Sequence, residues 1–216
     1  MSDKFNVGGG AFSALSKIFD VLFLSILWLI FCIPIITIGP STTALYYTTA
    51  KVIRKDRGYV WHEFWHAFKT NLVTGAIYTV VLAAIIAILF FAFNVTEGSE
   101  DFTMRVLRYV YIMIAFIVGC GYSFMFPVLS RFSLPRFQMF KMSFLLAIKH
   151  LPTTLFLMIL LLGAATVLWY IKPLVIFVPT IISWLCSLLI EIVFKKYLPK
   201  PEEDTPEEDL KWYQTF

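Results

Sequence analysis

The chain has 216 residues, of which 59% are hydrophobic, 18% aromatic and 15% charged, and its formal net charge is +4 at pH 7. A water-soluble domain of this size could not bury so much apolar surface, and the mean hydropathy of +0.80 is typical of a membrane protein. The positive charge does not indicate nucleic-acid binding, because the cations are spread along the chain and form no single basic patch.

Five long apolar segments dominate the sequence, and each is close to or above the roughly 20 residues that a helix needs to cross a bilayer. They predict an all-α fold, an integral membrane helical bundle with about five transmembrane helices, formed as one domain by residues 1–198. The predicted spans are residues 18–38, 72–93, 106–129, 151–171 and 173–194.

The first predicted span contains residues that disturb a membrane helix. Asp20 lies near its start, Pro34 lies near its end, and Gly39 and Pro40 follow it. A re-entrant or tilted helix is therefore an open alternative. A full span is favoured because residues 21–33 carry no charge and a proline near a helix end is tolerated in membranes.

Helical periodicity continues into the basic segment after this span. A helix is predicted to begin at Ser41 or Thr42 and to end at Gly58. Its apolar face comprises Leu45, Thr49, Val52 and Ile53.

A second amphipathic helix is predicted to lie along the cytoplasmic membrane interface before the chain turns into the span 72–93. Its apolar face comprises Trp61, Phe64, Trp65, Phe68 and Leu72. Its polar face comprises His62, Glu63, His66 and Lys69. The same spacing recurs before the fourth span at Phe137, Phe140, Phe144 and Ile148.

The last two spans are joined only at Lys172 and Pro173, which predicts a tight hairpin. Pro179 is expected to kink the last helix, and Glu191 near its end is expected to pair with Lys195 one turn later. Residues 199–216 are acidic and rich in proline, so we predict a disordered cytoplasmic tail.

Two pairs of segments have matching residues and suggest a parallel internal repeat. Residues 64–74 align with 144–154, and residues 31–37 align with 124–130. A chance match between aromatic-rich membrane segments is the alternative.

Lysine and arginine concentrate after the first and third spans and in the tail, which predicts that these segments are cytoplasmic. The N-terminus would then lie outside and the C-terminus in the cytoplasm. The outer face would carry Lys4, Lys17, Arg105, Arg108 and Lys172.

Several of these segments resemble the YesL family of bacterial membrane proteins. The matching residues run from Trp28 to Tyr47, then Gly58-Tyr59, Phe64, Phe68-Lys69-x-Asn71, Phe126-Pro127-Val-Leu-Ser-Arg131-Phe and Lys149-His150-Leu-Pro152-x-Thr154. The similarity extends to about residue 198, although Ser25 stands where the family often has asparagine. This resemblance implies a multi-pass protein of the bacterial cell (inner) membrane, of unknown biochemical activity, frequently associated with carbohydrate uptake by ABC transporters.

We therefore expect an accessory or scaffold component of carbohydrate ABC uptake. Its partners would be the lipid bilayer and an ABC transporter permease, with no nucleic acid. The expected partner-contact surface comprises Trp61, Phe64, Trp65, Phe68, Lys69, Phe144 and Lys149. A small-solute carrier or channel acting alone is the first alternative.

A zinc-dependent membrane protease is the second alternative, because His62-Glu63-x-x-His66 has the spacing of two zinc ligands and a general base. His150 and Glu191 are further ligand candidates on the same predicted side. The histidines lie on a solvated helix face, however, where a dry catalytic cavity is not expected. We accordingly predict no enzymatic activity, no catalytic residue and no cofactor.

Overall fold

The computed structural model describes residues 7–98, 101–132 and 134–197. Every regular element in these residues is a helix, which confirms the predicted all-α fold. The predicted tail 199–216 lies outside the described residues. The elements are α1 (Val7–Phe31), η1 (Ile35–Thr37), α2 (Ile38–Thr48), the π-helix η2 (Thr49–Ile53), α3 (Val60–Thr96), α4 (Phe102–Arg131), α5 (Arg136–Lys149), α6 (Leu151–Tyr170), η3 (Lys172–Ile176) and α7 (Val178–Phe194).

Three of the described helices, α3, α4 and α6, are long and apolar enough to cross a membrane, and α7 is a shorter apolar helix. These helices support the prediction of a membrane protein. They correspond to the second, third, fourth and fifth predicted spans.

The first predicted span is not one helix, because α1 ends at Phe31 and α2 begins only at Ile38. Pro34 adopts an extended conformation (φ −76°, ψ 124°) between them. The carbonyl of Phe31, left free by the helix end, accepts hydrogen bonds from Thr37 Oγ1 at 2.6 Å and Ser41 Oγ at 2.9 Å. The prediction of a single helix over residues 18–38 was therefore wrong.

The predicted turn between the second amphipathic helix and the second span is also absent. Residues 60–96 form the single helix α3, which is 37 residues long and extends over about 55 Å. The only glycine in it, Gly75, does not interrupt the helix. The preceding helix, predicted to end at Gly58, instead passes into the π-helix η2 and ends at Ile53, and Gly58 follows with a φ of 89°.

Two further predictions concern the kink at Pro179 and the internal repeat. The predicted kink at Pro179 is absent, because α7 begins at Val178 and Pro179 therefore lies in its first turn, where no hydrogen bond of the helix interior is lost. Pro127 lies inside the continuous helix α4, whereas its aligned residue Pro34 follows a helix end. The aligned segments thus differ in local structure, and the internal repeat stays a prediction.

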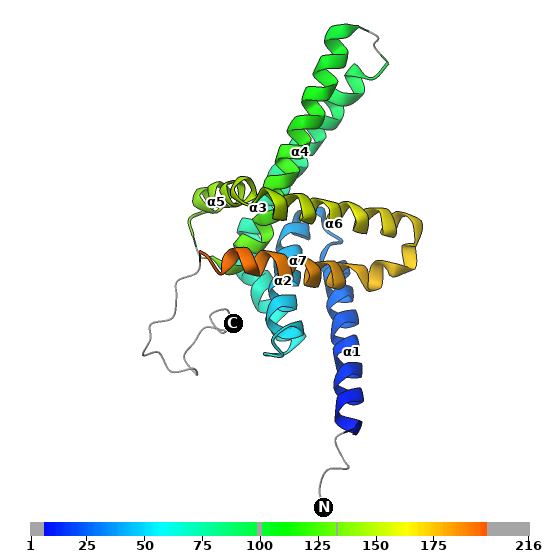
Figure 1. Ribbon diagram of the computed structural model, residues 1–216, viewed down its shortest axis with the longest axis vertical. Helices are drawn as coiled ribbons and strands as arrows, with labels where there is room; N and C mark the ends of the chain where they lie inside the picture. The colour runs from blue at the N-terminus through cyan, green and yellow to red at the C-terminus, as the bar shows by residue number, and fades with distance from the viewer. Residues whose placement is uncertain (1–6, 99–100, 133, 198–216) are drawn as a thin grey trace, which may run out of the picture.

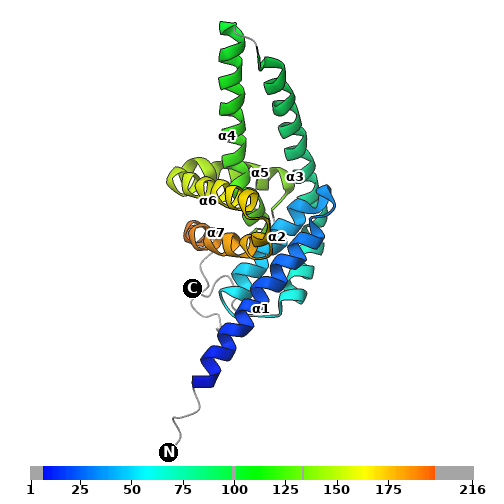
Figure 2. The same cartoon turned by 90° about the vertical axis from the view of Figure 1, so that its right-hand side faces the viewer.

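Figures 1 and 2 show how the helices are arranged. α3 and α4 form a long hairpin that projects from one end of the molecule, and α1 extends toward the other end. α6 and α7 form a second hairpin that lies across α4. This arrangement differs from five spans running side by side, since the start of α1 and the α3–α4 turn lie at opposite ends of the longest axis.

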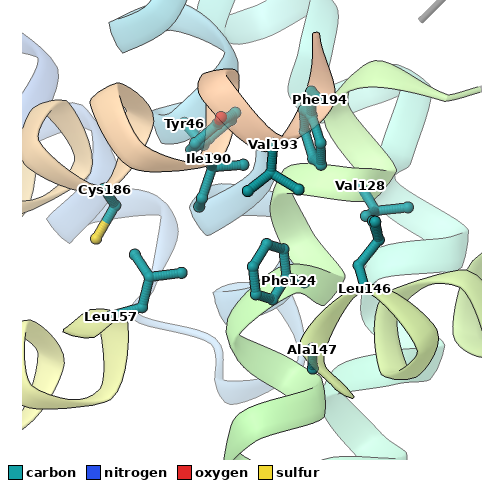
Figure 3. Packing of buried hydrophobic residues seen from close by; sticks show 10 residues of the cluster. All are labelled: Tyr46, Phe124, Val128, Leu146, Ala147, Leu157, Cys186, Ile190, Val193 and Phe194. Atoms are coloured by element: carbon teal, nitrogen blue, oxygen red, sulfur yellow. The ribbon is translucent and has the colours of Figure 1, made fainter. Parts of the chain in front are cut away.

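The described residues form three buried hydrophobic clusters, and two of them are larger than the third. The first joins α1, α2 and α3, and its aromatic centre is Phe31, whose ring centroid lies 5.5 Å from Phe64 and 4.8 Å from Phe68. The second joins α4, α5, α6 and α7 to α2 (Figure 3). Its buried members are Tyr46, Phe124, Val128, Leu146, Ala147, Leu157, Cys186, Ile190, Val193 and Phe194.

The backbones of α2 and α3 approach each other closely at two glycines. The N–H of Gly39 donates a hydrogen bond of 2.9 Å to Thr79 Oγ1. A Cβ atom at Gly75 would lie only 2.8 Å from the backbone nitrogen of Pro40. The absence of side chains at both glycines allows this contact.

Candidate functional site

The most unusual polar feature is an ion pair buried where α4 ends against α7. Arg131 donates a hydrogen bond from Nη2 to Oε1 of Glu191, and their side chains are 1% and 7% exposed. Arg54 lies on the other side of the same carboxylate, with Nη1 4.0 Å from Oε2. We call Arg54, Arg131 and Glu191 the Glu191 cluster.

Local structure positions each cation of this cluster. Arg54 directly follows the π-helix η2, and its N–H donates to the carbonyl of Thr49 at 3.1 Å. Its guanidinium also donates to the carbonyl of Ser187 in α7 at 3.1 Å. Arg131 is the last residue of α4, where a cation is stabilised by the negative end of the helix dipole. π-helical turns are frequent at functional sites.

Tyr46 of α2 connects the cluster with the hydrophobic core. Its side chain is 3% exposed and packs in the second hydrophobic cluster. Burial raises the pKa of the Tyr46 hydroxyl, while the charges of Arg131 and Arg54 act in the opposite direction. The hydroxyl therefore stays protonated and able to donate a hydrogen bond.

The predicted pairing of Glu191 with Lys195 was wrong. Glu191 accepts a hydrogen bond from Arg131 and forms a longer ion pair with Arg54, and both arginines are distant from it in the sequence. An acid in an apolar segment is a recognisable signal in the sequence, because such a charge is costly and needs a partner. Neither arginine could be chosen as that partner without the tertiary structure.

A second ion pair links η2 to the start of α3. Lys51 Nζ lies 2.7 Å from Glu63 Oε2, and the side chains are 19% and 9% exposed. Burial by itself would lower the pKa of Lys51, but the hydrogen bond and charge of Glu63 raise it. The prediction that Glu63 lies on an exposed polar face was therefore wrong, since Glu63 faces the interior.

This ion pair also changes the interpretation of the H-E-x-x-H motif. His62 is 78% exposed and His66 is exposed, while the carboxylate between them is engaged by Lys51. His150 lies elsewhere, with Nε2 3.2 Å from the hydroxyl of Tyr197. Among the described residues, no three His, Cys, Asp or Glu side chains form a group that could hold a metal ion.

The predicted contact surface divides into buried and exposed parts. Phe64 is 0% and Phe68 is 5% exposed, so their assignment to a contact surface was wrong. Trp61 is 51% exposed and its ring stacks on that of Trp65 at 5.9 Å. Lys69 is exposed, with Nζ 4.7 Å from the Trp65 ring centroid. We call Trp61, Trp65 and Lys69 the Trp61 face.

The other two predicted contact residues lie apart from each other. Phe144 is half-buried, packs on Phe140 at 4.7 Å and occupies the space beside Gly121. Lys149 is exposed, with Nζ 5.1 Å from the Tyr197 ring centroid. Of these two residues, only Lys149 has an exposed side chain that a partner can contact.

Lys55, next to the Glu191 cluster, is expected to titrate unusually low. Burial and the nearby charges of Arg131 and Arg54 lower its pKa to about 8. Competitive acetylation of the folded protein should therefore give a half-maximal reactivity near pH 8 for Lys55.

The same shift affects stability. Between about pH 8 and the model-peptide value of 10.5 the unfolded chain holds more protons at Lys55 than the folded protein. Stability contributed by this residue should accordingly rise with pH in that window, and Lys55→Gln should abolish that rise. An ordinary pKa for Lys55 would contradict the proximity of the cations.

Residues 21–93 match the model of DUF624, a family described as a protein of unknown function. This region contains the second part of α1, all of α2 and η2 and most of α3, and thus the Lys51–Glu63 pair and the Gly39–Gly75 contact. The chain is also similar to an uncharacterized protein, YteU, of Bacillus subtilis (strain 168). The two are 26% identical over 170 residues, which cover 77% of this chain and 76% of the relative. No solved structure matches the chain.

Proposed function

We propose that this membrane protein is an accessory component that binds another protein of the bacterial inner membrane. The Trp61 face is the observation that carries this proposal. It is an exposed aromatic and basic surface on a helix that is anchored in the core by the neighbouring residues Phe64 and Phe68. Tryptophan in a preformed, rigid position is the kind of side chain that dominates protein interfaces.

We propose a carbohydrate ABC permease as the partner, on the basis of the resemblance to YesL. The Trp61 face precedes the apolar part of α3, so it would lie at the cytoplasmic end of that span if the C-terminus is cytoplasmic. There it could contact the cytoplasmic loops of a permease.

The proposal includes no catalytic role for the chain and no cofactor. The carboxylates of Glu63 and Glu191 are already engaged by cations, which suits a structural role better than acid–base chemistry. No specific observation favours independent transport of a polar solute over this accessory role.

Co-purification from native membranes tests the proposal. The tagged chain, expressed at its native level in sugar-grown cells, should retain a carbohydrate ABC permease in mild detergent. The double variant Trp61→Ala/Lys69→Glu should reduce that recovery at least tenfold, because both exposed side chains of the Trp61 face are altered while the core is left intact.

Trp169→Ala/Lys172→Glu is the matched control. It removes another exposed tryptophan and lysine, which lie at the end of α6 and at the start of η3. The control should retain the permease. Absence of any permease with the unmodified chain, or equal loss in both double variants, would overturn the proposal.

A further inference from the structure

A cavity of about 470 Å³ lies between the α6–α7 hairpin and the rest of the molecule. This volume is in the range of sites that hold small ligands. Leu157 of α6 and Cys186 of α7, which lie near each other in Figure 3, both line it. Leucine, isoleucine, valine, methionine and aromatic side chains make up most of its wall.

The cavity is long and reaches the surface of an apolar helix. Its wall includes α7 residues from Val178 to Ile190, a helical distance of about 18 Å. On α6 it includes Leu161 and Leu162, which are 42% and 62% exposed and therefore form its rim. Because α6 is apolar and long enough to span a membrane, the cavity would open toward hydrocarbon.

Two residues that line the cavity, Tyr46 and Ser183, have a buried hydroxyl without a hydrogen-bond partner among the described residues. Ser183 lines the cavity and is 8% exposed, yet no described residue forms a hydrogen bond with its Oγ. Two other hydroxyls in the wall are satisfied: Ser123 donates to the carbonyl of Gly119 and Thr42 to that of Ile38, at 2.9 and 2.7 Å. A buried hydroxyl without a partner is costly, so a ligand acceptor at Ser183 would be stabilising.

We infer that this cavity binds an acyl chain of a membrane glycerophospholipid, with Ser183 Oγ donating a hydrogen bond to an ester carbonyl. An acyl chain matches the long apolar wall, and the ester carbonyl supplies the acceptor that Ser183 lacks. The lipid enters from the bilayer past Leu161 and Leu162. This inference is independent of the proposed partner protein.

Photochemical cross-linking with a lipid probe tests the inference. The full-length protein would be reconstituted in phosphatidylcholine–phosphatidylglycerol vesicles that contain a phospholipid with a diazirine in one acyl chain. After irradiation, peptide mass spectrometry should find lipid adducts at the cavity residues Met158, Ile182 and Cys186. Adducts are also expected on the exposed residue Ile159, which faces the surrounding bilayer.

Two neighbouring alanines of α6 provide matched variants. Ala164→Phe should fill the cavity and reduce the adducts at Ile182 and Cys186 at least fivefold, without changing those at Ile159. Ala165→Phe should change neither set, because Ala165 is exposed and does not line the cavity. Ser183→Ala, which leaves the cavity open, should reduce the adducts about threefold.

Absence of cavity adducts in the unmodified protein would overturn the inference whether or not Ala164→Phe folds. Equal cavity adducts in both phenylalanine variants, each with a native circular dichroism spectrum, would also overturn it. Lipid extraction from the purified protein adds a separate criterion. Recovery of a bound phospholipid supports the inference, and recovery of a free fatty acid in its place contradicts it.

Discussion

Glu191→Ala should destabilise the folded protein by about 3–5 kcal/mol, because it leaves Arg131 charged, buried and without its carboxylate. Arg54 would lose the same carboxylate but keep its hydrogen bond to the carbonyl of Ser187. The free energy of unfolding, measured by denaturant titration in mild-detergent micelles, gives the size of the effect.

A double variant separates the loss of the ion pair from the loss of packing. Arg131→Met/Glu191→Leu removes both charges and keeps apolar volume, so its stability should return to within about 1–2 kcal/mol of the unmodified protein. Glu97→Ala, at an exposed position, should change the stability by less than about 0.5 kcal/mol. If Glu191→Ala behaved like Glu97→Ala, Glu191 would not be the buried counter-ion of Arg131.

Gly75→Ala should destabilise the protein by about 1–3 kcal/mol, and Gly75→Val by more. The added Cβ would lie 2.8 Å from the nitrogen and 2.9 Å from Cδ of Pro40, so the backbones of α2 and α3 would have to separate. That separation would also lengthen the hydrogen bond between Gly39 and Thr79. The midpoint of thermal unfolding in detergent should fall accordingly.

Gly163→Ala is the matched control in another apolar helix. A Cβ at Gly163 meets no atom within 4 Å, so only helix propensity changes, and stability should rise by up to about 1 kcal/mol. A similar response of the two glycines would show that α2 and α3 do not touch at Gly75.

The family match at residues 21–93 covers the segment in which both the Gly75 contact and the Lys51–Glu63 pair occur. The Lys51–Glu63 pair holds the start of α3 against η2, and the Gly75 contact holds a later part of α3 against α2. The Trp61 face lies beside the ion pair, so we expect the pair to keep the proposed partner surface in place.

Several features could be predicted from the sequence because they depend on local composition. Long apolar segments identified the helices that became α3, α4, α6 and α7, and the basic segment between the third and fourth spans identified α5. Pro34, Gly39 and Pro40 left a re-entrant or tilted helix open as an alternative to the first predicted span, but they did not indicate that α1 ends at Phe31. The uninterrupted helix through residues 60–96 was missed, because periodicity does not report whether two adjacent helices are continuous.

By itself the sequence determined the helical class and the membrane character. Only the tertiary structure decided the partners of the buried groups. The amphipathic pattern placed Glu63 on a polar face and Phe64 and Phe68 on a contact surface, yet all three are buried. The physical reason is that burial and ion pairing depend on the helices that pack against a face, and those neighbours are distant in the chain.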